Sequence, residues 1–129
     1  MNYKEEIENK INGFIKYHNF KFISFENNEC IIEAPIEEIG MNPYGMVHGG
    51  LLFGLMDTCA GLHTLLETKR EAVTTNSTIN YIKACKGSKI VAKTKPIKIG
   101  KNLAVIEVNA YNDKDELVTT GIFDYYFIN

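Results

Sequence analysis

Apolar side chains recur at helical spacing near the start of the chain. The intervals between them are four, three and one residues, with charged residues in between, for Ile7, Ile11, Phe14 and Ile15. Positions with this spacing share one face of an α-helix. The pattern therefore predicts an amphipathic helix over residues 2–17, within an N-terminal helical segment of residues 1–18.

A longer and more uniformly apolar stretch lies in the middle of the chain. Leucine occupies positions 51, 52, 55, 62, 65 and 66, and few polar residues interrupt this stretch. A helix with so little polar surface has to be covered by other elements. We therefore expect residues 49–68 to form a central helix that the rest of the fold encloses.

The remaining apolar residues follow strand patterns. Strands are predicted over residues 20–25, 30–35, 73–83, 89–99, 103–111 and 117–128. Asn27-Asn28 marks a turn between the first two, and Pro96 predicts a bulge or an edge position in the fourth. Short turns join the later strands, which favours an antiparallel meander over residues 71–128.

These elements predict one α+β domain over residues 1–129. A curved antiparallel sheet of five or six strands that wraps the central helix is the simplest way to bury it. A chain of 129 residues is long enough for such a core without disulfides or metals.

Composition narrows the partners and the compartment. The chain is 45% hydrophobic and 23% charged with a formal net charge of −2, so neither nucleic acid nor a membrane is the expected partner. No apolar run reaches the roughly 18 residues of a membrane span, and the first residues lack the apolar core of a signal peptide. Three cysteines in no CxxC pair argue against a disulfide framework. We expect a cytoplasmic protein.

The charges are unevenly distributed along the chain. Between Ala72 and Ile106 there is no acidic residue, but there are seven lysines, at positions 83, 86, 89, 93, 95, 98 and 101. These lysines form either a solvated sheet surface or a site for a multiply phosphorylated ligand, which local positive potential attracts. The pattern alone leaves both interpretations open.

Asp57 is a carboxylate within the apolar run of the central helix. Desolvating a carboxylate is costly, so such a residue has either compensating partners or a chemical role. Helical spacing places it on one face with Gly50, Gly54, Gly61 and Thr64. Each glycine costs about 1 kcal/mol relative to alanine. Something must therefore approach the helix backbone closely: a packed strand or symmetry-related helix, a ligand passing Asp57, or both.

His48-Gly49-Gly50 precedes the helix. The first amides of a helix lack intrahelical partners and favour negative charge, so these glycines offer N–H groups for an oxyanion hole. A histidine at a helix entry most simply orders the loop. No two histidine, cysteine or acidic residues share metal-ligand spacing, so neither a metal nor a cofactor is expected.

The motif of Asn42, Gly45, His48-Gly49-Gly50 and Asp57, followed by TTNSTINY at residues 74–81, resembles a known family. It is similar to the hotdog-fold acyl-CoA thioesterases of the PaaI-like, 4-hydroxybenzoyl-CoA thioesterase superfamily, from about residue 30 to the end. The resemblance implies the hotdog fold, in which an antiparallel sheet wraps a long helix. It also implies an active site formed between two subunits of a dimer or tetramer.

The resemblance assigns roles to individual residues. Asp57 matches the general base or nucleophile, and Gly49 matches the N–H that polarises the thioester carbonyl. Asn42 matches a residue that positions the carbonyl or the attacking water, and Thr74 one that holds the water. His48 matches the family's histidine, which we interpret as support for the loop and the Asn42 side chain.

The sequence also provides candidate substrate contacts. The small face at Gly50, Gly54 and Gly61 leaves room for an acyl group, and Lys83, Lys98 and Lys101 are the expected contacts of the CoA phosphates. Where the family commonly has an Arg-Pro or similar pair, this chain has Lys83-Ala84, which leaves the nucleotide contacts open.

We therefore expect a hydrolase that cleaves acyl-CoA to a free acid and CoA. One alternative is a hotdog module that binds acyl-CoA without turnover. Another is a hotdog enoyl-CoA hydratase, but those enzymes use an Asp and a His five residues apart, and the residue five after Asp57 is Leu62.

Overall fold

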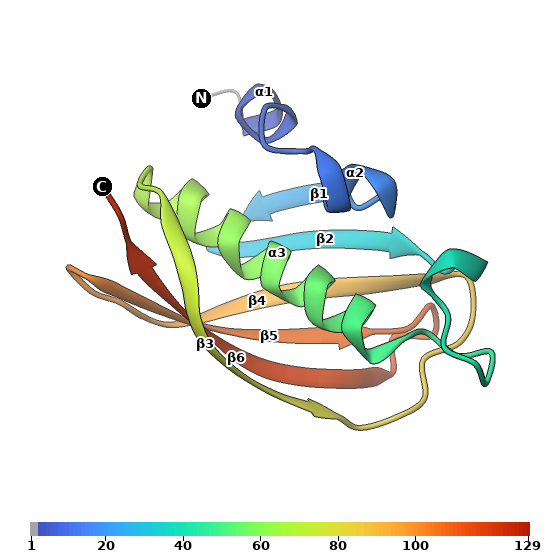
Figure 1. Ribbon diagram of the computed structural model, residues 1–129. Coiled ribbons are helices and arrows are strands. Elements are labelled where there is room, and N and C mark those ends of the chain that lie inside the picture. Colours follow the sequence, from blue (N-terminus) through green and yellow to red (C-terminus); the bar gives the residue numbers. More distant parts are fainter. Residues whose placement is uncertain (1–2) are drawn as a thin grey trace.

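The central helix and the wrapping sheet are both present. In the computed structural model, which describes residues 3–129, one long helix lies against the inner face of a curved six-stranded sheet (Figure 1). Every strand pair is antiparallel. The strands are β1 (Lys21–Glu26), β2 (Glu29–Pro35), β3 (Ala72–Tyr81), β4 (Lys89–Ile99), β5 (Leu103–Tyr111) and β6 (Leu117–Phe127). The predicted hotdog architecture is therefore confirmed.

Helix α3 (Gly49–Thr68) has the predicted bounds and supplies much of the core. Leu55, Met56 and Cys59 on it are fully buried, together with Ile106 and Phe123 of the sheet. Among the described helices, α3 alone has the length and mean hydropathy of a membrane span, and 56% of that window is buried inside the fold. Core helices of globular proteins have the same length and mean hydropathy.

The N-terminal segment differs from the prediction of a single helix. It contains two short helices, α1 (Tyr3–Glu8) and α2 (Gly13–Tyr17). The break follows from Asn12, whose backbone is extended, and Gly13, whose φ of +50° lies in the left-handed region that glycine tolerates. The fully buried Ile7 anchors α1 in the core.

The predicted meander is correct only for β4, β5 and β6. The strand order is β1-β2-β4-β5-β6-β3, so β3 pairs with β6 and not with β4. Alternation of apolar and polar residues fixes which face a residue occupies, but it does not encode the neighbouring strand. The predicted turn at Asn27-Asn28 and the irregularity after Pro96 are both confirmed.

Strand β3 forms one edge of the sheet. Its inner side pairs with β6, and within the described part of the chain no strand pairs with its outer side. Most of its residues are exposed, including the apolar side chains of Val73 and Tyr81. A long edge strand with exposed apolar residues is suited to pairing with another chain.

Candidate active site

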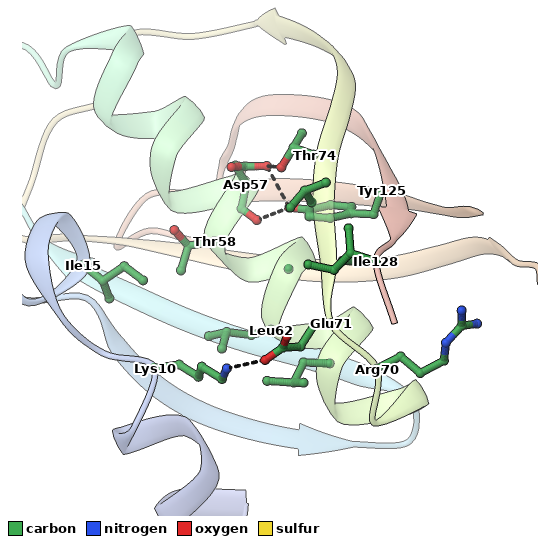
Figure 2. Close-up of a pocket in the computed structure, with 14 residues that line it drawn as sticks. Lys10, Ile15, Asp57, Thr58, Leu62, Arg70, Glu71, Thr74, Tyr125 and Ile128 are labelled. Atoms are coloured by element: carbon green, nitrogen blue, oxygen red, sulfur yellow. Dashed lines mark hydrogen bonds and ion pairs between the residues drawn. The ribbon is translucent and has the colours of Figure 1, made fainter. Parts of the chain in front are cut away.

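Asp57 is held by two hydroxyl groups from separate strands. Thr74 Oγ1 donates a hydrogen bond to Asp57 Oδ1 at 2.8 Å, and the Tyr125 hydroxyl donates to the same oxygen at 2.7 Å (Figure 2). The Tyr125 hydroxyl also contacts the Asp57 backbone carbonyl oxygen. Two donors on one carboxylate oxygen fix the orientation of the side chain. Within the described residues, no hydrogen bond engages Oδ2.

Burial keeps Tyr125 in its donating form. Its side chain is 3% exposed, and burial raises the pKa of its hydroxyl, to which the negative charge of Asp57 adds. The phenol therefore keeps its proton at neutral pH. This residue was absent from the sequence-based site. The available signal was the tyrosine hydroxyl between Phe123 and Phe127 on the inward face of β6, because buried tyrosines usually have a partner for that group.

Strand pairing brings the two donors together. Thr74 on β3 lies opposite Tyr125 on β6, and the register shifts directly after Thr74. Such an irregularity re-aims the neighbouring side chains, and it is common beside active sites. Gly61, one helical turn after Asp57, faces the same ring, and a Cβ there would be in ordinary van der Waals contact with the Tyr125 hydroxyl oxygen at 3.4 Å.

Asp57 lies on the wall of a cavity of about 470 Å³. Thr74, Tyr125 and Gly61 share this wall with mainly apolar side chains from the N-terminal segment, α3 and the start of β3. Lys10 and Glu71 form an ion pair at 3.1 Å elsewhere on its rim (Figure 2). The cavity combines a hydrogen-bonded carboxylate with a largely apolar surface, which suits a reaction on the polar end of an apolar substrate.

The predicted oxyanion donor lies in a different cavity, of about 280 Å³. It is lined by Gly49, Asn42, Lys83 and Tyr81, among others. No acceptor for the Gly49 N–H occurs among the described residues. The Tyr81 hydroxyl donates to the Gly49 carbonyl oxygen at 2.8 Å, and a Cβ at position 49 would lie 3.1 Å from the Tyr81 ring. Only glycine fits there without a shift of that ring.

His48 and Asn42 have separate structural roles. His48 caps α3, because its Nδ1 accepts a hydrogen bond from the Gly50 N–H at 2.8 Å. The Asn42 Oδ1 accepts from the N–H groups of Tyr44 and Met46 and closes its own loop. The expectation that His48 supports the Asn42 side chain is therefore corrected, since within the described chain no hydrogen bond joins the two. The Gly50 N–H is therefore used in capping, whereas the Gly49 N–H has no acceptor within the described residues.

Other predicted substrate contacts are spread over the molecule. Gly54 faces Phe14 of α2, whose ring would lie 2.7 Å from a Cβ at that position, so packing within the chain accounts for this glycine. Lys83 pairs with Glu116 beside the Gly49 cavity. Lys98 is on β4, and the Lys101 carbonyl in the following turn accepts from Arg70 at the other end of α3. One chain alone does not bring the three lysines together.

Metal-ligating and redox groups are sparse in the described residues. No cluster of three or more His, Cys, Asp or Glu side chains occurs there. Cys30, Cys59 and Cys85 are free and buried.

Comparison with known families identifies the chain. The family model of the Thioesterase superfamily matches residues 44–119, and this range is more than half of the chain. The chain belongs to this superfamily. The match includes Gly49, Asp57 and Thr74, and the enzyme is a thioester hydrolase.

Solved structures of thioesterases have the same fold. Thioesterase HI1161 from Haemophilus influenzae superimposes with a TM-score of 0.92 at 20% identity, over 100% of this chain and 92% of that one. The PaaI protein of the E. coli phenylacetic acid degradation operon gives 0.88 at 18%, over 97% and 91%. The Streptococcus mutans protein smu.793, solved with acetyl CoA, gives 0.83 at 29%, over 93% and 94%.

Proposed function

We propose that this thioesterase hydrolyses acyl-CoA to a free acid and CoA at a site shared by two copies of the chain. The observation that carries the proposal is the Asp57 carboxylate, held by the Thr74 and Tyr125 hydroxyls on the wall of an apolar cavity. Hydrolysis of an acyl thioester needs a base or nucleophile next to an apolar pocket for the acyl chain. The acetyl CoA bound to smu.793, which is 29% identical, supports a CoA thioester as substrate.

Asp57 acts in one of two ways. As a general base, it takes a proton from a water molecule whose oxygen attacks the thioester carbon, and the resulting carboxyl then protonates the departing thiolate. As a nucleophile, it attacks the carbon itself, releases the thiolate and forms an anhydride that water hydrolyses. Both routes use Oδ2, because both hydroxyl donors bond to Oδ1. Thr74 Oγ1 keeps lone pairs with which it can accept a bond from the water.

The oxyanion donor comes from the second copy. Asp57 and Gly49 are eight residues apart on one helix, which separates their backbones by about 12 Å along its axis. That distance is too long for one thioester group to contact both. The free Gly49 N–H of one copy, with the Asn42 amide N–H₂ beside it, therefore polarises a carbonyl held next to Asp57 of the other. The exposed edge strand β3 supplies the surface on which the copies pair.

A shared site also explains the scattered lysines. Lys83 lies next to the Gly49 cavity, and Lys98 and Lys101 lie at the opposite end of the sheet. Lysines from two copies can then surround the phosphates of one CoA molecule.

Turnover by Asp57→Asn tests the proposal. The variant keeps the side-chain shape and can still accept the Thr74 and Tyr125 hydrogen bonds, but it loses the charge. We expect kcat to fall by roughly 10²- to 10⁴-fold in a free-thiol assay with short, medium, long and aromatic acyl-CoAs. Asp115→Asn is the matched control, because Asp115 is an exposed turn residue with φ +59°, which asparagine adopts readily.

Thermal unfolding and size-exclusion elution should be the same for both variants. Near-normal turnover by Asp57→Asn would reject the assignment. Binding of acyl-CoA by the wild type without release of thiol would instead identify a binding module.

A further inference from the structure

The cavity beside Asp57 continues along α3 as an apolar groove. We call it the α3 groove and define it by Asp57, Gly61 and Leu65 on the helix, Ile15 and Val73 on its walls, and the Lys10–Glu71 ion pair. We propose that the α3 groove binds the acyl chain of a straight aliphatic thioester of roughly eight to ten carbons without a charged end. This inference rests on the proposed function, since it places the thioester at Asp57.

The length follows from the helix geometry. Asp57, Gly61 and Leu65 are successive i, i+4 positions on one face of α3. Eight residues advance about 12 Å along a helix. An extended hydrocarbon advances about 1.3 Å per carbon, so roughly eight to ten carbons cover that distance. Gly61 lines the cavity at the midpoint, where its Cα faces the Tyr125 ring.

The polarity of the lining selects a chain without a charged end. Beyond Asp57, Thr74 and Tyr125, the middle of the groove is lined by apolar side chains. The Thr58 hydroxyl donates to the Gly54 carbonyl oxygen at 2.7 Å, so its proton is already used within the helix. A carboxylate on the substrate would lose its hydration there without gaining a donor.

Charged groups limit the groove at its far end. Lys10 Nζ lies 3.1 Å from Glu71 Oε1, with both side chains about half exposed. The Arg70 guanidinium, also on the lining, donates to the carbonyl oxygens of Asn129 and Lys101 and lies over the Phe127 ring. A longer chain would have to desolvate the ion pair or continue into water, and neither adds binding energy.

A chain-length series on the wild-type protein is the first test. We expect kcat/KM to rise about two- to fourfold per added methylene from acetyl- to decanoyl-CoA, as burial of each methylene predicts. It should then level off to hexadecanoyl-CoA. An optimum at acetyl-CoA, at an aromatic acyl-CoA, or at a decanoyl-CoA that carries a terminal carboxylate would overturn the inference.

Leu65→Phe tests the groove directly. The larger ring blocks the distal half, so the ratio of kcat/KM for decanoyl-CoA to kcat/KM for butanoyl-CoA should fall about tenfold. Leu117→Phe is the control, because Leu117 is a partly exposed residue of β6 outside the groove, and it should change neither value. Equal losses at all chain lengths in Leu65→Phe would contradict the assignment.

Binding measurements distinguish a failure of the groove assignment from a failure of the proposed reaction. Calorimetry with Asp57→Asn should show decanoyl-CoA binding at least tenfold more tightly than butanoyl-CoA, and Leu65→Phe in that background should abolish the difference. If the wild type hydrolyses no acyl-CoA but this difference is present, the proposed reaction fails and the groove stands. If hydrolysis occurs and neither affinity nor kcat/KM depends on chain length, the groove assignment fails alone.

Discussion

The Tyr125 hydroxyl lies 2.7 Å from Asp57 Oδ1, although the two residues are 68 positions apart in the chain. The hydroxyl belongs to β6 and the carboxylate to α3, so packing of the helix on the sheet sets this distance. Burial raises the pKa of Tyr125, with the negative charge of Asp57 as the second cause, and the phenol remains a donor. The pair fixes the position of the carboxylate without neutralising it.

Tyr125→Phe should remove this positioning bond and leave the ring in place. A hydrogen bond to a charged group contributes about 1.5–3 kcal/mol, so kcat/KM should fall by roughly 10- to 100-fold. Most of that loss should be in kcat and little in KM, because the bond positions the reacting carboxylate and not the substrate. Tyr126→Phe is the control, since Tyr126 is 48% exposed and does not line the cavity. A raised KM with an unchanged kcat in Tyr125→Phe would contradict the positioning role.

Gly49→Pro should remove the oxyanion donor alone. Proline is well tolerated at the first position of a helix, and His48 already has the extended backbone, with φ −63° and ψ 134°, that precedes proline. We expect kcat to fall by roughly 10²- to 10³-fold, as for loss of other oxyanion donors. Gly49→Ala is the matched control, because it meets Tyr81 with the same Cβ but keeps the N–H. Equal activities of the two variants would argue against the donor.

Mixed oligomers should recover activity if the site is shared. When Asp57→Asn and Gly49→Pro chains are unfolded and refolded together, half of the dimers contain one chain of each kind. Each such dimer has one intact site, so about a quarter of wild-type activity should return under statistical exchange. Refolding each variant alone is the control. Failure to recover activity, with mixed dimers demonstrated by mass spectrometry, would place both groups in one chain.

His63 should make the fold less stable in mild acid. It is fully buried, with Nδ1 2.6 Å from Thr94 Oγ1 and Nε2 3.8 Å from Glu67 Oε1. Burial lowers its pKa from the ordinary value of 6.5, and Glu67 only partly opposes this. The unfolded chain therefore binds more protons than the folded chain just below pH 6.5, and the free energy of unfolding decreases there as the pH falls.

Denaturant titrations between pH 7.5 and 5 measure this dependence. His63→Gln removes the titrating group, so its stability should vary less over that range even if it is lower throughout. The same pH slope in the variant and the wild type would assign the effect to other groups.

Individual elements show which parts of the fold could be predicted from the sequence patterns. The bounds of α3 and the turn at Asn27-Asn28 were predictable because each depends on residues close together in the chain. The N-terminal helix was predicted as one piece because its apolar spacing continues through Asn12 and Gly13, where the backbone breaks it. The pairing of β3 with β6 was missed because a strand's pattern does not specify its partner.

The candidate site likewise contains residues that the sequence identified and contacts that only packing creates. Local motifs singled out Asp57 and Gly49, since an acidic residue in an apolar helix and a Gly-Gly helix start are visible in one stretch of chain, whereas Thr74 was assigned by the family resemblance. The Tyr125 bond, the use of the Gly50 amide by His48 and the separation of the two cavities depend on packing.

The sequence by itself determined the two-layer architecture, the central helix and the carboxylate within it, because helical and strand periodicity are local properties of the chain. The tertiary structure decided which hydroxyls hold that carboxylate and which glycine amide is free. It also decided how far the apolar groove extends from Asp57. These are contacts between residues distant in sequence, and their geometry exists only once the sheet has closed around the helix.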